Sequence, residues 1–280
     1  MAKLRSYRLW ELRWNEIDAL DRDSTLIIQP TGAIEQHGYH LPLDTDIHDS
    51  SEIAYRVADQ AMGADFGTIL VAPPIWWGTS PHHLAYPGTI SLNMKTMSDL
   101  MVDIVSSLWR HGFYRVLFLN GHGGNAGVLS ATALRISQEV GISPAVASYW
   151  TLIPDTIRAV GETGRGGMGH ACEMETSLQL YLRKEGVDMS QATKDMPREL
   201  TSFSHIDFRE PGPVMIPWDF ARDSRTGTMG DPTVATVEKG RRIGEAAVEK
   251  VFALSKELLA LKADDLKSGT TKGGGRRLGQ

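Results

Sequence analysis

A cluster of metal-binding residue types directly follows an apolar run near the N-terminus. The run Leu26–Ile28 has the length and composition of a buried strand. The next segment, Glu35–Asp46, contains three carboxylates and two imidazoles. Such donors at the end of a strand in an α/β sheet are typical of a divalent metal site. This segment therefore predicts a buried sheet with a metal at its edge, although a polar loop with solvated charges remains an alternative for the segment taken alone.

Short apolar runs alternate with helical patterns through the first half of the chain. Strands are expected at 26–28, 69–72, 116–119 and 145–148, and helices at 49–60, 94–110 and 126–140. In the second helix the apolar residues recur at the i, i+3, i+4 spacing of one buried stripe. This alternation predicts an α/β fold whose mostly parallel sheet is covered by helices.

The C-terminal third has a different pattern. Four prolines between 211 and 232 interrupt any long element, so this segment is expected to wrap the surface or to form a lid. A last helix is expected at 234–261. We predict a single domain over 1–262, followed by a basic, glycine-rich tail over 263–280 that is flexible or meets a neighbouring subunit.

The composition excludes several classes of function. A net charge of −5 provides no basic field for nucleic acid. No apolar run approaches the roughly 20 residues that a membrane helix needs, and residues 1–6 do not resemble a signal peptide. The single cysteine, Cys172, rules out an internal disulfide. We therefore expect a cytoplasmic protein that acts on a small molecule.

Two later segments add candidates for chemistry. His122 lies in the glycine-rich stretch 120–125, which follows a predicted strand and opens a helix. A phosphate-cradling turn is the alternative there, but the stretch presents an imidazole and fits no phosphate-loop pattern. In the segment 169–177, His170 and Glu173 are three residues apart and share a face if a helix begins there. Glu175 is a further acidic residue of that first turn, where the helix dipole alone would favour it.

Two other matches are weaker. Residues 164–169 fit G-x-G-x-x-G literally, but no strand precedes them, so a dinucleotide site is not expected. Cys172 next to His170 suggests a thiol nucleophile. A lone cysteine is more often small core filler.

The chain resembles the creatininase family of metal-dependent amidohydrolases. The matching segments occur in the family's order over roughly residues 10–255: 32–38, 41–46, 86–91, 120–125 and 170–177, with weaker echoes at 148–150, 230–232 and 238–240. The resemblance implies a three-layer α/β/α fold, a binuclear metal centre and usually a hexamer. Zn²⁺ is expected, with Mn²⁺ possible in one site.

The resemblance also implies roles for individual residues. Glu35 and His122 would hold one ion, His37 the other, and Asp46 would bridge them. Creatininase proper has a metal-binding glutamate at the position of Gly124, and Glu173 is expected to replace it. The catalytic residues would be His170, as acid/base, and Glu175, which would orient His170 or a ligand.

The expected reaction is hydrolysis of a C–N bond of a cyclic amide by a metal-bridging hydroxide. Creatinine itself is not expected as the substrate, because Gly124 lacks the ligand and Gly166 stands where creatininase has one of its two substrate tryptophans. An inositol-derived cyclic diketone or a lactone is an alternative substrate, and a non-catalytic metal-binding subunit is an alternative of another class. The predicted substrate contacts are Trp150, Trp77, His83, Gly124 and Asn125.

Overall fold

The sheet at the centre of the molecule has four parallel strands in the order β2-β1-β3-β4. The computed structural model describes residues 4–267. Within them the strands are β1 (Thr25–Thr31), β2 (Thr68–Val71), β3 (Arg115–Asn120) and β4 (Ala145–Ser148). All four lie where the apolar runs predict them.

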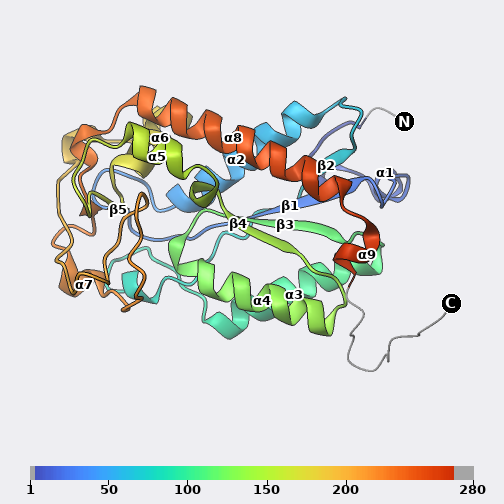
Figure 1. Cartoon of the computed structure of the whole chain (residues 1–280), viewed down its shortest axis with the longest axis horizontal. Coiled ribbons are helices and arrows are strands. Elements are labelled where there is room, and N and C mark those ends of the chain that lie inside the picture. Colours follow the sequence, from blue (N-terminus) through green and yellow to red (C-terminus); the bar gives the residue numbers. More distant parts are fainter. Residues whose placement is uncertain (1–3, 268–280) are drawn as a thin grey trace.

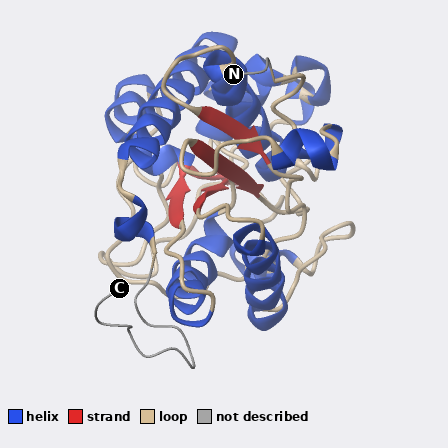
Figure 2. Ribbon diagram, turned by 90° about the vertical axis from the view of Figure 1, so that its right-hand side faces the viewer, coloured by secondary structure: helices blue, strands red, loops and turns tan. Residues whose placement is uncertain are grey.

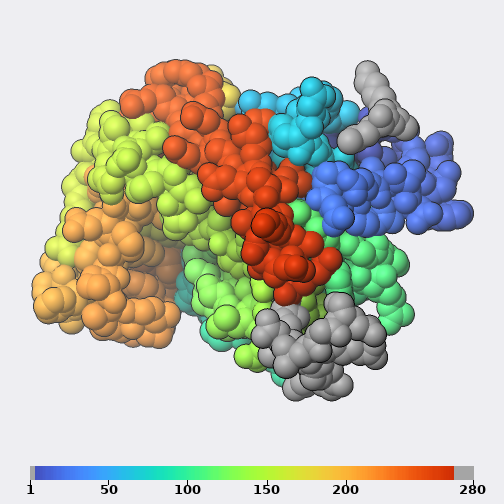
Figure 3. All heavy atoms as spheres, turned by 45° about the vertical axis from the view of Figure 1, so that its right-hand side comes forward, coloured from blue at the N-terminus to red at the C-terminus, as the bar shows by residue number. Residues whose placement is uncertain are grey.

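Helices cover both faces of this sheet, so the predicted three-layer α/β/α fold is confirmed (Figures 1 and 2). One layer contains α2 (Thr45–Ala61), α5 (Pro154–Val160), α6 (Glu173–Leu182) and α8 (Val237–Ala260). The other contains α3 (Met94–Arg110) and α4 (Ala126–Glu139). Figure 3 shows α8 in orange and red, crossing one face of the molecule.

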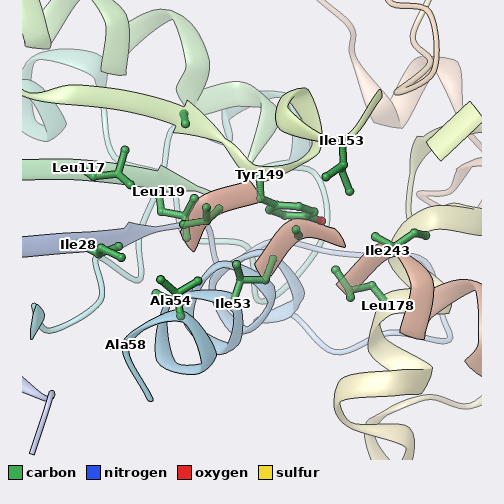
Figure 4. Close-up of a cluster of buried hydrophobic side chains, with 14 of the residues drawn as sticks. Ile28, Ile53, Ala54, Ala58, Leu117, Leu119, Tyr149, Ile153, Leu178 and Ile243 are labelled. Atoms are coloured by element: carbon green, nitrogen blue, oxygen red, sulfur yellow. The ribbon is translucent and has the colours of Figure 1, made fainter. Parts of the chain in front are cut away.

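Alternate side chains of the strands join different hydrophobic clusters on the two faces of the sheet. Leu26 and Ile28 of β1 join Leu117 and Leu119 of β3 in the cluster beneath α2, α6 and α8 (Figure 4). The intervening residues of β3, such as Phe118, belong to the cluster under α3 and α4. Because successive side chains of a strand point to opposite faces, a strand buried on both faces must be apolar throughout.

The remaining elements are short. Among the described residues they are α1 (Trp14–Asp18), α7 (Phe220–Asp223), α9 (Ala263–Leu266), β5 (Met168–His170) and β6 (Met229–Gly230), the last two paired antiparallel. Single 3-10 turns lie at η1 (Leu9–Glu11), η2 (Pro81–His83), η3 (Gly123–Asn125), η4 (Tyr149–Leu152), η5 (Lys184–Gly186), η6 (Met189–Gln191) and η7 (Pro232–Val234). No helix within residues 4–267 is long and apolar enough to cross a membrane.

The proline-rich segment and the start of the predicted tail both contact the domain. In the former, Phe220 of α7 is buried. In the latter, Leu266 of α9 is buried and its carbonyl accepts a hydrogen bond from Ser143 N at 2.7 Å. Leu266 therefore packs on the domain, and the division of the chain at residue 262 stays a prediction. The remainder of the predicted tail, 268–280, lies outside the described residues.

Candidate metal centre

The ends of β1 and β3 bring the two best candidate segments together. Thr31, the last residue of β1, pairs with Asn120, the last residue of β3. The loop that carries Glu35 and His37 therefore starts beside the loop that carries His122. The N-terminus of α2 meets both loops, because a Cβ at Gly121 would lie 2.1 Å from the carbonyl oxygen of Asp46. Only glycine allows this approach, and it places Asp46 between the two loops.

Asp46 faces a histidine with each of its carboxylate oxygens. Its Oδ1 accepts a hydrogen bond from His37 Nε2 at 3.1 Å, and its Oδ2 lies 2.9 Å from His122 Nδ1. All three side chains are buried. A carboxylate held between two imidazoles in this way is suited to bridge two cations.

Glu35 is surrounded by three further imidazole contacts. Its Oε1 lies 3.3 Å from His83 Nε2, 3.3 Å from His122 Nδ1 and 3.7 Å from His170 Nδ1. Neither oxygen of this fully buried carboxylate accepts a well-directed hydrogen bond within residues 4–267, and the same holds for Asp46 Oδ2. Buried carboxylate oxygens are almost always satisfied, so these three lack the partner that a cation would provide.

Hydrogen bonds to the outer ring nitrogens fix how the imidazoles are turned. His37 Nδ1 donates to the Glu35 carbonyl at 3.1 Å, and His170 Nε2 donates to the Gln36 carbonyl at 2.8 Å. The Gln36 side-chain amide donates to His83 Nδ1 at 2.8 Å. Histidine ligands of metals characteristically bond their second nitrogen in this way, which leaves the first free to bind the ion.

Burial and charge shift the protonation of the group. For His37, burial opposes the charged form, but the charge and hydrogen bond of Asp46 outweigh it and raise the pKa to about 10. Burial also opposes the ionised form of Asp46, yet the charge of His37 and the contacts with His122 and His37 lower its pKa. Burial raises the pKa of Glu175 to about 7. Protonated imidazoles thus supply the positive charge that these buried carboxylates need, and bound cations would supply it equally well.

Five of the nine histidines of the chain take part in possible metal-binding groups. The groups found in the described part of the chain are Glu35–His37–Asp46, Glu35–His82–His122, Glu35–His83–His170 and His37–His170–Glu175, each with ligand atoms within 4.8 Å of one another. The mixed nitrogen and oxygen donors suit Zn²⁺ or Mn²⁺. The residues present therefore fit a divalent metal centre.

The structure corrects the expectation that Glu173 is a metal ligand. Its carboxylate is fully buried but binds elsewhere: Oε1 accepts a hydrogen bond from Lys239 Nζ at 2.6 Å, and Oε2 accepts one from the Thr163 hydroxyl at 2.8 Å. Glu162 N also donates to it, at 3.0 Å. With Lys239 as its counter-ion, Glu173 anchors α6 to α8 and has no oxygen to offer to the centre.

Glu175, expected to act through its neighbours, is the glutamate of α6 that faces the histidines. It offers an oxygen within 4.8 Å of ligand atoms of His37 and His170. Its Oε2 also accepts a hydrogen bond from Cys172 N at 3.4 Å, as part of the capping box at the start of α6. The helix start therefore positions this carboxylate, and Cys172 is buried beneath it as core.

Two of the predicted substrate contacts have packing or hydrogen-bond partners within the protein. Asn125 is fully buried, and its side chain binds Thr79 N at 2.9 Å and the Gly32 carbonyl at 2.9 Å, so its amide ties the loops together. Trp150 packs edge to face against Phe208 with ring centroids 5.2 Å apart. The amide of Asn125 is thus engaged within the protein, whereas Trp150 is partly exposed and its contact with a substrate stays a prediction.

The other predicted substrate contacts lie in or near the centre. His83 belongs to one of the possible metal-binding groups, with Glu35 and His170. Gly124 adjoins His122, and its carbonyl accepts a hydrogen bond from the Thr79 hydroxyl at 2.7 Å. Trp77 is about half exposed, on the same loop as His83, and stays available for a substrate.

Sequence analysis missed two residues of the site. Gln36 lies between the two predicted ligands Glu35 and His37. Apart from that position, nothing in the sequence indicates that it belongs to the site. Phe220 lies in the aperiodic proline-rich segment, and its ring covers His83 and His170 with centroid distances of 3.9 and 4.9 Å. A surface pocket of about 630 Å³ lies beyond it, against α7, and no metal-binding residue lines that pocket.

Comparisons with known proteins agree with this geometry. The family model "Creatininase: Creatinine amidohydrolase" matches residues 10–255. The mycofactocin precursor peptide peptidase of Mycobacterium tuberculosis is 34% identical over 240 residues, covering 82% of this chain and 84% of the relative. The creatinine amidohydrolase of Pseudomonas putida is 30% identical over 263 residues, covering 88% and 95%.

Solved structures extend the similarity to three dimensions. A creatininase structure with Mn aligns with a TM-score of 0.76 and 28% identity, and a Zn-Zn form of a mutant creatininase aligns with a TM-score of 0.76 and 27% identity. Each alignment covers 92% of this chain and 100% of the other. The chain therefore belongs to the creatininase family of hydrolases.

Proposed function

We propose that this protein hydrolyses a C–N bond of a cyclic amide and that two divalent ions, Zn²⁺ or Zn²⁺ with Mn²⁺, occupy its centre. The observation that carries the proposal is the Asp46 carboxylate, which faces His37 with one oxygen and His122 with the other. The names of two relatives, a peptidase and an amidohydrolase, both denote hydrolysis of amide bonds, which supports C–N cleavage.

The side chains divide into two sets around Asp46. Glu35 and His122 are close enough to hold one ion, and His37 the other. Glu175 takes the place proposed from sequence for Glu173, on the side of His37. When bound, the ions supply Lewis acidity that activates a water molecule and polarises a substrate carbonyl.

His170 is suited to move the proton that amide hydrolysis requires. The Gln36 carbonyl holds the proton of His170 on Nε2, so the lone pair of Nδ1 points towards Glu35, 3.7 Å away. Burial lowers the pKa of His170, which keeps the imidazole neutral and able to accept a proton. His170 would take a proton from the attacking water at Nδ1 and deliver it to the departing nitrogen, a step typically worth about 10²–10⁴-fold in rate.

The enclosure of the group favours this chemistry. Phe220 packs on His83 and His170, and the four residues Glu35, His37, Asp46 and Glu175 are buried. Charged groups that are kept from bulk water act on a substrate more strongly than exposed ones.

Metal analysis tests the proposal directly. Protein purified without added metal should contain about two divalent ions per chain, and removal of the ions by a chelator should abolish hydrolysis of creatinine-like cyclic amides. Asp46→Asn should lose both ions. Asp44→Asn, two residues away and paired with Arg183 at 2.6 Å, is the matched control and should keep both. Full activity in metal-free protein would refute the proposal.

A substrate panel separates the alternatives. Turnover of a cyclic diketone or a lactone, with none of any amide, would favour the C–C or lactone reaction. Tight binding of two ions with no turnover of either class would favour a metal-binding subunit. The hexameric state, the single domain and the cytoplasmic location remain predictions; light scattering of the purified protein tests the first.

A further inference from the structure

The metal-binding loop after β3 has no room for a side chain at position 124. A Cβ there would lie 2.4 Å from His122 Nε2 and 2.5 Å from the Thr79 carbonyl oxygen. The third atom it would meet, at 2.9 Å, is Cε1 of His82. Position 124 therefore cannot supply a ligand, and part of the space beside it is filled by an imidazole from another loop.

His82 reaches this place from the turn η2, on the loop that follows β2. Its ring lies parallel to that of His122, with an interplanar angle of 6° and centroids 5.8 Å apart. A nitrogen of His82, a nitrogen of His122 and an oxygen of Glu35 lie within 4.8 Å of one another. These three residues form a compact set of two imidazoles and one carboxylate.

The His122 ring has hydrogen-bond partners within the protein, whereas the His82 ring does not. His122 Nε2 donates to the Thr79 carbonyl at 3.1 Å. Within residues 4–267, no hydrogen bond or ion pair involves the side chain of His82, whose ring packs on those of His83, His122 and Phe220. The ring is partly buried. Its nitrogens are therefore not engaged by another group of the protein and are free to bind an ion.

We propose that His82 is a further ligand of the ion held by Glu35 and His122. This inference rests on the proposed metal-dependent function and deepens it. Together with the bridging Asp46 carboxylate, this set would offer the ion two nitrogen and two oxygen donors.

A metal-binding experiment tests the role of His82 without using activity. The variant His82→Phe retains a flat ring that can stack on His122 and Phe220 but removes the nitrogens. Zinc is measured by elemental analysis after dialysis, and Co²⁺-loaded protein is followed by its visible absorption. His111→Phe, at the exposed end of α3, is the control.

The wild type and the control should retain two ions, and His82→Phe should retain about one. Zinc affinity at the lost site should fall more than about 100-fold, because even loss of an outer-shell partner costs 10–100-fold. The Co²⁺ spectrum should change accordingly. In His82→Gly, added imidazole should restore the second ion; this variant also provides the test if His82→Phe does not fold.

The outcomes separate the two proposals. If the wild type holds two ions and both His82 variants also hold two with an unchanged Co²⁺ spectrum, His82 only packs against His122, and this inference is wrong while the proposed function stands. If the wild type binds no ion at all, both proposals are wrong.

Discussion

Replacing Lys239 with methionine should destabilise the fold and leave the metal content unchanged. Lys239 Nζ lies 2.6 Å from Glu173 Oε1 and 2.9 Å from Glu162 Oε1, and it donates to the Val234 carbonyl at 2.8 Å. Glu173 is fully buried. Methionine keeps the length and apolar character of the lysine stem but leaves the Glu173 carboxylate without a counter-ion.

The size of the effect follows from the contacts that remain. Removing one partner of a buried ion pair typically costs about 3–5 kcal/mol. Glu173 would keep its hydrogen bonds from the Thr163 hydroxyl and from Glu162 N, so we expect the lower end, about 3 kcal/mol. For a chain of this size that corresponds to a fall in Tm of roughly 6–12 °C. Glu173→Gln/Lys239→Met removes both charges and should recover part of the loss.

The stability difference between wild type and Lys239→Met should change with pH in one direction only. Burial opposes the charge of Lys239, but its hydrogen bonds with Glu173 and Glu162 outweigh burial and raise the pKa above its ordinary value of 10.5. A raised pKa stabilises the folded state fully below pH 10.5, and this stabilisation is lost as the pH rises through the folded value. The stability difference between wild type and Lys239→Met should therefore be constant near neutral pH and shrink in strong alkali.

Urea unfolding followed by circular dichroism, with elemental analysis of each variant, measures both parts of this prediction. Glu173→Gln should also keep two ions, with a stability loss of about 1–3 kcal/mol. The reasoning is refuted if Lys239→Met is as stable as wild type, or if Glu173→Gln loses an ion at unchanged stability, since Glu173 would then act on the metal and not on α8.

Three further predictions concern other parts of the molecule. Gly240→Ala should destabilise by about 2 kcal/mol in urea unfolding, because its Cβ would lie 1.8 Å from the Ser177 carbonyl oxygen; an unchanged or higher stability would contradict this close helix contact. Cys172 is fully buried and should resist alkylation until the protein unfolds, as mass spectrometry of iodoacetamide-treated protein would show. The hydrogen bond from Arg222 lowers the pKa of Asp223 to about 2, which contributes stability above pH 3.8 that is lost as the pH falls through about 2. Asp223→Asn should therefore cost about 1 kcal/mol at pH 7 and almost nothing near pH 2 in acid titrations monitored by circular dichroism.

The elements that the sequence predicts well are those with a strong period. The apolar stripe over 94–110 is the whole of α3, and the four apolar runs are the four strands. The core of the metal centre is predictable for a related reason. Glu35, His37 and His122 follow directly on strands, and neighbouring parallel strands end at the same edge of the sheet, so strand assignment alone brings them together.

Residues that depend on long-range packing are not predictable in this way. Phe220 belongs to a proline-rich segment without a period, and no local signal indicates that its ring covers His83. From the sequence alone, Asn125 is a polar residue that follows a strand, which is a typical position for a ligand contact. Its partner Thr79 lies on another loop, 46 residues away, and only the folded chain shows that their hydrogen bond already occupies the amide.

The exchange of Glu173 for Glu175 shows the same limit within one helical turn. Two residues apart on an α-helix point about 200° apart, so only one of these glutamates can face the edge of the sheet. Both precede the same apolar run, and neither spacing nor charge distinguishes them. The two glutamates are distinguished by Lys239 of α8, which lies 66 residues after Glu173 in the chain. Its ammonium group gives Glu173 a buried counter-ion on the side away from the histidines. Glu175 has no such cation among its hydrogen-bond and ion-pair partners in the described residues, and burial, together with the charges of Asp46 and Glu35, raises its pKa to about 7. A carboxylate in that position gains the most from a divalent ion beside His37, and for this physical reason we propose Glu175, and not Glu173, as the metal ligand.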